Sequence, residues 1–269
     1  MQSEKNYIEI NKTSWNNRVD AHLASAFYDV EGFLKGNTSL NDIELKLLGD
    51  VKGKTILHLQ CHFGQDTISL ARLGARVTGV DLSDKAIDAA NELVKKTNTD
   101  VTFICCDIYD LPNHLNEKFD MVFTSYGTIG WLPDMHKWAN VIATFLKPNG
   151  KFVFVEFHPV VWMYDDNFET VKYNYFNAGE IVESETGTYA DKDAPIKTDY
   201  IGWNHDLAEV LTSLITNGIE INTFQEFDYS PYNCFGKTVE FEPNKFRIAH
   251  LGDRIPMVYA IAGTKKVEG

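Results

Sequence analysis

The chain has 269 residues, of which 44% are hydrophobic and 23% charged, a composition typical of a globular protein and not of a disordered one. Asp and Glu outnumber Lys and Arg by 38 to 25, and the net charge of −13 disfavours nucleic acid and anionic membranes as partners. No stretch approaches the ~18 apolar residues of a membrane span, and the first residues do not form a signal peptide. We therefore expect a cytoplasmic protein, monomeric or homodimeric, that acts on a small molecule.

The first 49 residues carry many aromatic side chains among polar ones, with weak helical periodicity. Apolar residues on one stripe of 40–48 predict a short helix there. We expect residues 1–49 to form an N-terminal helical segment that precedes the main sheet.

Apolar runs and helical patterns alternate between residues 54 and 157. The strands are apolar runs rather than alternating ones, as expected for strands that helices cover on both faces. Their order predicts a parallel α/β sheet. Strands are expected at 54–60, 76–81, 101–106, 119–125 and 150–157, and helices at 65–73, 84–96 and 134–146.

The alternation stops at residue 158. Residues 158–205 have little helical period, but 181–189 has β character, so we expect an inserted hairpin or lid on the substrate side. A helix at 206–217 and strands at 219–227 and 256–263 follow, with an aromatic loop at 229–236 between the two strands. The whole chain, 1–269, is expected to be a single domain with this insertion.

The most informative segment is the run from Thr55 to Gly64, followed by a strand that ends in Asp81. This acid falls about 20 residues beyond the turn, the spacing at which nucleotide-binding folds place a carboxylate on ribose hydroxyls. A dinucleotide fingerprint has three glycines in the turn, but here Gln60 and His62 replace two of them. Because glycine lets the backbone approach a pyrophosphate, the turn indicates an adenosine-type ligand without phosphates. An NAD-type Rossmann enzyme is the less favoured alternative.

Polar side chains follow several strands of the expected sheet. Asp81, Asp107 and Ser125 lie at the ends of the second, third and fourth strands, and the Gln60–Gly64 turn leads into a helix N-terminus, which favours anions. Ligands of open α/β sheets bind beyond the carboxyl ends of the strands. We therefore expect these groups to share one site.

This series of motifs resembles the class I S-adenosylmethionine-dependent methyltransferases from about residue 50 to the C-terminus. Their first motif commonly reads hydrophobic-Leu-Asp/Glu-x-Gly-x-Gly-x-Gly, and in this chain His58 stands where the family has the acid. The resemblance implies a three-layer, Rossmann-like, seven-stranded mixed sheet with an antiparallel last strand and helices on both faces. Residues 219–227 and 256–263 fit the closing pair of strands.

The resemblance also implies the cofactor S-adenosylmethionine, with S-adenosylhomocysteine as its product. The turn would pass the methionine part, Asp81 would bind both ribose hydroxyls and Leu82 would pack on the adenine. Asp107 would accept from the adenine amino group, and the Ile108 amide would reach a ring nitrogen. The N-terminal segment would fold over the cofactor as a lid, where Arg18 could pair with the cofactor carboxylate. The expected cofactor-binding residues are Gln60, Cys61, His62, Gly64, Asp81, Leu82, Asp107, Ile108, Ser125 and Arg18.

Candidates for the acceptor side follow the fourth and fifth strands. His158 is a candidate general base, because histidine titrates near neutral pH, and Glu156 could orient an amine or hydroxyl. Tyr126 and Trp131 could form walls of the methyl-transfer site, since an aromatic face favours a sulfonium cation. His158, Glu156 and Tyr126 are therefore the catalytic candidates. The alternative for Glu156 and His158 is that they only anchor the insertion.

His58, Cys61 and His62 offer three possible metal donors, but a strand that runs into a turn does not aim them at one point. We expect no metal and a hydrogen-bonded His58 within the sheet. The expected reaction is in-line displacement of the sulfonium methyl by an oxygen, nitrogen, sulfur or carbon atom of a small-molecule acceptor, promoted by alignment and exclusion of water. A protein that binds the cofactor or its demethylated product without catalysis is a second alternative.

Overall fold

The computed structural model describes residues 4–267, so residues 1–3 of the expected N-terminal segment and residues 268–269 lie outside the described part. The helices are α1 (Glu4–Ala24), α2 (Val30–Leu34), α3 (Asp42–Leu48), α4 (Gln65–Arg72), α5 (Asp84–Thr97), α6 (Met135–Phe145) and α7 (Leu207–Thr216). The strands are β1 (Thr55–Leu59), β2 (Arg76–Asp81), β3 (Val101–Cys105), β4 (Phe119–Ser125), β5 (Leu146–Phe157), β6 (Ile181–Thr186), β7 (Lys197–Gly202), β8 (Ile219–Phe227), β9 (Thr238–Glu242), β10 (Lys245–Ile248) and β11 (Val258–Lys265).

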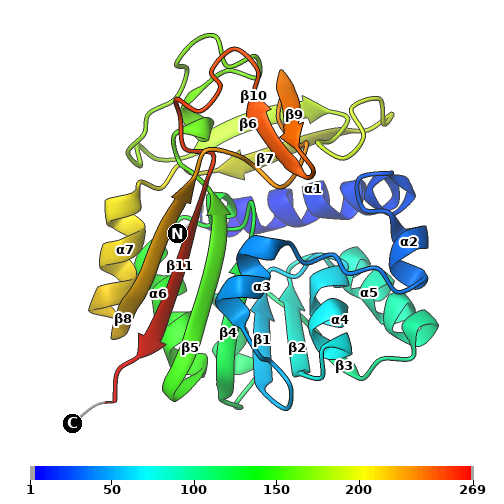
Figure 1. The fold of residues 1–269 in the computed structure, drawn as a ribbon, viewed down its shortest axis with the longest axis vertical. Coiled ribbons are helices and arrows are strands. Elements are labelled where there is room, and N and C mark those ends of the chain that lie inside the picture. Colours follow the sequence, from blue (N-terminus) through cyan, green and yellow to red (C-terminus); the bar gives the residue numbers. More distant parts are fainter. Residues whose placement is uncertain (1–3, 268–269) are drawn as a thin grey trace.

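The main sheet has seven strands in the order β3-β2-β1-β4-β5-β11-β8 (Figure 1). The pairs from β3 to β5 are parallel, and β11 is antiparallel to both β5 and β8. The predicted mixed sheet with an antiparallel last strand is confirmed, including its closing pair β8 and β11. The chain crosses from β1 to β4 after forming β2 and β3, which opens a crevice at the carboxyl ends of β1 and β4.

Helices cover both faces of this sheet, as predicted. Along β5, Phe152 and Phe154 pack with Trp138 of α6, whereas Val153 points to the opposite face and packs in the cluster that includes α3 and α4. Alternate side chains of one strand thus enter two separate apolar cores. This double burial explains why the strands are mostly apolar runs and do not alternate between polar and apolar residues.

The largest differences between the predicted and observed strands of the main sheet are in β5 and β11. β5 begins at Leu146, before the Pro148–Gly150 turn, because Leu146 pairs with Phe119 ahead of a register shift in the β4–β5 ladder. The last strand, β11, is displaced toward the C-terminus relative to the predicted range 256–263. Neither difference moves a carboxyl end that faces the crevice.

Two hairpins and α1 form a layer above the carboxyl ends of the sheet (Figure 1). The expected hairpin in the insertion is present as β6 and β7. The β9–β10 hairpin was not predicted, although its strands flank a turn at Pro243–Asn244, where Asn244 has a positive φ of 57°. Polar-apolar alternation around that turn was the available signal.

α1 is one continuous helix, although its sequence shows little apolar periodicity. Its buried face is largely polar, because residues at helical spacing, Asn11, Ser14, Arg18 and His22, are all enclosed by protein. Asn11 exchanges two hydrogen bonds with the backbone of Ile201 in β7, at 2.8 and 2.9 Å. The helix is therefore fixed to the inserted hairpin by polar contacts that a hydrophobicity pattern does not show.

Candidate active site

A cavity of about 1210 Å³ lies between the carboxyl ends of the sheet and the layer formed by α1 and the hairpins. All ten residues expected to bind the cofactor line it, from Arg18 in the N-terminal helix to Ser125 at the end of β4. Tyr126 and Glu156 also line the cavity, but His158 does not. The structure thus brings together every predicted site residue except the candidate base.

The turn between β1 and α4 keeps a glycine-like backbone without the glycines. Gln60, His62 and Gly64 have φ angles of 55°, 49° and 80°, the left-handed region that costs a non-glycine residue about 1–2 kcal/mol. Only Gly64 is required by packing, because a Cβ there would lie 2.4 Å from the Phe103 ring. At the other two positions the same backbone carries side chains that line the cavity.

Several buried polar atoms of cavity-lining residues lack a partner within the described part of the chain. The Gln60 amide donates to the Thr128 carbonyl at 2.8 Å, but its Oε1 is unpaired. His62 Nδ1 and Arg18 Nε are also unpaired. Buried polar groups are rarely left unsatisfied, so these atoms indicate a polar ligand at the turn. An amino-acid tail, with donors and acceptors of its own, fits them.

Asp81 and Asp107 accept hydrogen bonds from backbone N–H groups, and both line the cavity. Asp81 accepts from the His62 and Ser83 N–H groups at 2.7 and 2.9 Å, and Asp107 accepts from the Tyr109 N–H at 2.7 Å. Burial raises the pKa of Asp81 to about 6 and also raises the pKa of Asp107. A carboxylate has about four lone-pair sites, so both groups keep acceptors for ligand hydroxyl or amino groups.

His58 lies within β1 and forms a hydrogen bond to α4. Its Nδ1 lies 2.8 Å from the Thr67 hydroxyl of α4, and its ring stacks on Phe123. Burial lowers the pKa of His58 to about 3, so the imidazole is neutral. The predicted hydrogen-bonded role is confirmed. Among residues 4–267, no group of three or more His, Cys, Asp or Glu side chains has the arrangement of a metal site.

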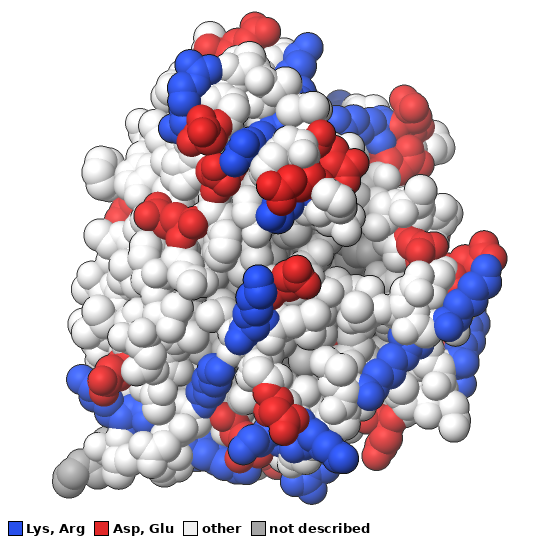
Figure 2. Space-filling view, in the orientation of Figure 1, with Lys and Arg blue, Asp and Glu red and all other residues white. Residues whose placement is uncertain are grey.

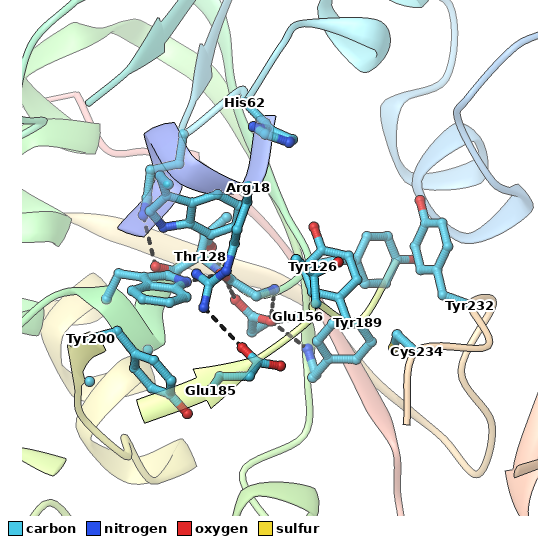
Figure 3. A pocket seen from close by; sticks show the side chains of 18 of the residues that line it. Arg18, His62, Tyr126, Thr128, Glu156, Glu185, Tyr189, Tyr200, Tyr232 and Cys234 are labelled. Carbon is cyan, nitrogen blue, oxygen red and sulfur yellow. Dashed lines mark hydrogen bonds and ion pairs between the residues drawn. The ribbon is translucent and has the colours of Figure 1, made fainter. Parts of the chain in front are cut away.

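Arg18 projects from α1 into an aromatic enclosure above the turn (Figure 3). Its guanidinium lies 5.3–5.6 Å from the ring centres of Trp15, Trp131 and Tyr200, distances at which cation–π attraction operates. It also forms a 2.9 Å ion pair with Glu185 of β6. The guanidinium is thus held at the roof of the cavity, with Nε left over for a ligand.

The insertion side of the cavity has aromatic walls. Tyr126 from the sheet faces Tyr232 and Cys234 from the loop after β8, while Tyr189 and Tyr200 come from the insertion (Figure 3). The aromatic loop at 229–236 supplies Tyr232, Cys234 and Phe235 to the lining of the cavity. Sequence reasoning missed Tyr189 and Tyr200, because the pattern of the insertion predicts a hairpin but not which of its aromatic side chains face the cavity.

Glu156 is a buried anchor of the loop that follows β4. Its two carboxylate oxygens accept from the backbone N–H groups of Gly127, Thr128, Ile129 and Phe157 and from the Thr128 hydroxyl. Burial raises the pKa of Glu156, and these donors oppose the shift. With both oxygens already occupied, Glu156 is better suited to position the loop than to orient an acceptor.

Tyr126 has a strained backbone, with a positive φ of 45°. Its hydroxyl donates to Glu44 of α3 at 2.9 Å, and its ring packs edge-on against Tyr232. Strain of this kind persists only where the surroundings impose it, and it is common at ligand sites. Tyr126 is therefore placed to shape the cavity wall.

His158 lies outside the cavity, contrary to the role of general base considered for it. Its Nε2 is 2.9 Å from Glu226 of β8, and its Nδ1 accepts from the Val160 N–H at 3.2 Å. Both ring nitrogens are engaged, and the ring packs against Tyr259. This placement favours the alternative role, in which His158 anchors the start of the insertion.

Comparisons with known proteins agree with this geometry. Residues 56–150 match the model of the methyltransferase-domain family. The chain is 30% identical over 135 residues to the ubiquinone biosynthesis O-methyltransferase of Coxiella burnetii (strain Dugway 5J108-111), covering 49% of this chain and 57% of that protein. The chain thus spans little more than half the length of such curated relatives.

Solved structures share the fold over more of the chain. An S-adenosylmethionine-dependent methyltransferase from Mesorhizobium loti has a TM-score of 0.58 at 20% identity, covering 86% of this chain and all of that one. A second structure is geranyl diphosphate C-methyltransferase from Streptomyces coelicolor, solved with Mg²⁺, geranyl diphosphate and S-adenosyl-L-homocysteine. It has a TM-score of 0.55 at 17% identity, and the match covers 82% of this chain and 76% of that one.

The strand order and the crevice above β1 and β4 define a class I, Rossmann-like methyltransferase fold. The methyltransferase-domain match at residues 56–150 runs from β1 to the first residues of β5, so the matched segment lies within this fold.

Proposed function

We propose that this protein transfers the methyl group of S-adenosylmethionine to a small-molecule acceptor. The observation that carries the proposal is that ten residues from separate segments, each assigned to the cofactor from sequence, line one cavity. The relatives named as O-methyltransferases and the structural neighbour solved with S-adenosylhomocysteine support the same donor.

The residues of the cavity divide between donor and acceptor. Asp81 would hold the ribose, Asp107 and Ile108 the adenine, and the Gln60–Gly64 turn with Arg18 the amino-acid tail. When bound, the cofactor supplies a methyl group on a positively charged sulfur that leaves as a neutral thioether. The cavity exceeds the roughly 300–1,000 Å³ of a typical small-ligand pocket, which leaves room for an acceptor as well.

The chain contributes alignment and exclusion of water rather than a nucleophile of its own. The α1 helix and the β6–β7 hairpin cover the crevice, and aromatic side chains face the acceptor region. Alignment of reacting groups in such an enclosed site can supply much of the rate. A fully engaged His158 outside the cavity supports a reaction that needs no histidine base.

Charge supports a small acceptor over nucleic acid. Figure 2 shows acidic and basic side chains interspersed on the visible face rather than gathered into one basic patch. The chain as a whole carries a charge of −13. No helix within residues 4–267 has the length and apolar character needed to cross a membrane.

Calorimetric titration with S-adenosylmethionine, S-adenosylhomocysteine and NAD tests the donor. We expect the first two to bind and NAD not to bind, and binding of NAD alone would overturn the proposal. Transfer of a radiolabelled methyl group to a metabolite library tests the reaction. Cofactor binding without transfer to any compound would favour a binding protein instead.

A further inference from the structure

The first turn of α4 carries a carboxylate to which no role has yet been assigned. Asp66 lines the cavity directly after the Gln60–Gly64 turn, on the first turn of the helix. The Ser125 hydroxyl, at the end of β4, donates to its Oδ2 at 3.3 Å. Asp66 is thus placed on the same wall as residues assigned to the amino-acid tail of the cofactor.

Asp66 has no cationic partner in the described part of the chain. None of the ion pairs among residues 4–267 includes it. The titratable groups that interact with it are a carboxyl, a thiol and phenols, none of which supplies a positive charge: Glu44, Cys61, Tyr28, Tyr126 and Tyr232. Burial raises the pKa of Asp66 to about 6, the direction expected for an acid without a nearby cation.

A second acceptor beside the cavity, on the turn that precedes α4, lacks a donor within residues 4–267. Gln60 Oε1 is buried, lines the cavity and has no partner within residues 4–267. The Gln60 oxygen needs an N–H donor, and the Asp66 carboxylate has no positive charge beside it. A ligand cation with several N–H donors would satisfy both groups. The amino-acid tail expected at this turn carries such a group, its α-ammonium.

The residue near the end of β1 cannot supply the negative charge that Asp66 would supply from α4. His58, which stands where the family has an acid, is neutral and hydrogen-bonded to Thr67, so it offers no negative charge to a ligand. We propose that Asp66 binds the α-ammonium group of the cofactor, so that the carboxylate absent at His58 is supplied from the first turn of α4. This inference rests on the proposed function. Arg18 would face the carboxylate of the same tail, which pairs both charges of the zwitterion.

The test compares three ligands by calorimetry: S-adenosylhomocysteine, its desamino analogue, which lacks only the ammonium group, and 5′-methylthioadenosine, which lacks the whole amino-acid tail. The wild-type chain should prefer S-adenosylhomocysteine over the desamino analogue by at least about tenfold, the effect expected of a charged hydrogen bond. In D66N this preference should fall below about threefold, with the affinity for 5′-methylthioadenosine within about twofold of wild type.

Two control variants separate this effect from general damage. D107N should weaken all three ligands by a similar factor, because Asp107 is assigned to the adenine. D88N, at an exposed position on α5, should change none of them. If thermal unfolding shows that D66N is not folded, D66E displaces the charge by one methylene and should reduce the same preference.

Retention of the wild-type preference in D66N would overturn the inference, as would a wild-type chain that binds S-adenosylhomocysteine and its desamino analogue equally. A lower turnover at saturating cofactor with the preference intact would also overturn it, because Asp66 would then act on the acceptor. A wild-type chain that binds none of the three ligands would overturn the proposed function together with the inference.

Discussion

His22 of α1 and His62 of the β1–α4 turn share a hydrogen bond, with His22 Nδ1 2.9 Å from His62 Nε2. This bond joins the N-terminal helix directly to the turn assigned to the cofactor. A neutral imidazole carries one N–H, so the pair presents one donor and one acceptor at its outer nitrogens, which have no partner in the described part of the chain. Burial lowers the pKa of both histidines, with Arg18 contributing in the same direction.

Replacing His22 with glutamine should make the protein less sensitive to acid. Burial lowers the pKa of His22 from 6.5 to about 3, so between these pH values the unfolded chain binds a proton that the folded chain does not. The free energy of unfolding of the wild type should therefore fall as the pH falls through this window. In H22Q the dependence of this free energy on pH should be smaller by up to about 1.4 kcal/mol per pH unit. Urea unfolding at pH 7, 6 and 5 measures the free energy of unfolding of both proteins.

The exposed His136 provides the matched control, since H136Q also removes a histidine. Burial raises the pKa values of three carboxyl groups, Asp66, Asp81 and Glu44, which makes stability rise as the pH falls. These groups are present in all three proteins, so their effect cancels in the comparison. Equal slopes for wild type, H22Q and H136Q would show that the buried pair does not determine the acid sensitivity.

Asp81→Ala should weaken S-adenosylhomocysteine binding by more than about tenfold. The substitution leaves two ribose hydroxyls without an acceptor, and it also releases the His62 and Ser83 N–H groups that Asp81 holds. Calorimetric titration measures the change, with D88A at an exposed position as control. Unchanged affinity would mean that Asp81 only organises the turn and the start of α5.

Glu156→Gln should lower the free energy of unfolding by about 2–3 kcal/mol. In the wild type, backbone N–H groups donate to both carboxylate oxygens, whereas in the variant some of them would face the N–H donors of the glutamine amide. Methyl transfer should fall as well, since the loop after β4 carries Trp131 and accepts from Gln60. Urea unfolding and initial rates are the measurements. E220Q, at an exposed position on β8, is the control. Wild-type stability in E156Q would contradict the anchoring role.

His158→Gln separates the two roles considered for this residue. Its position outside the cavity predicts a methyl-transfer rate within about twofold of wild type, with a loss of stability of about 1 kcal/mol from the lost contact with Glu226. Rates at saturating cofactor over a range of pH, together with urea unfolding, test this. A large loss of turnover with unchanged cofactor affinity would restore His158 as the base.

Much of the fold was predictable because the core strands are buried on both faces. Residues 152–155 read Phe-Val-Phe-Val, an apolar run typical of a strand that is covered on both sides. The sequence predicted a helical N-terminal segment but not the length of α1, and it did not predict the β9–β10 hairpin. The hairpin lies in the layer above the sheet, and the buried face of α1 is polar, so apolar periodicity does not identify either of them.

The cofactor side of the site was also accessible from sequence. Asp81, Asp107 and Ser125 directly follow strands, and parallel strands bring their carboxyl ends to one edge. The acceptor side depends on contacts between residues far apart in the chain, such as Tyr126 with Tyr232, which no local pattern encodes.

The sequence by itself predicted the alternation of strands and helices, the turn in which Gln60 and His62 replace glycines, and the carboxylates at the strand ends. These features follow from local spacing and from the burial of each strand. Only the tertiary structure decided which side chains face the cavity. It placed His158 against Glu226 and joined His22 to His62 by a hydrogen bond. It gave Asp66 no cationic partner among residues 4–267. Side-chain direction and charge pairing depend on the packing of the whole chain, so the same residue types take a role in the site or a role in anchoring according to where the fold places them.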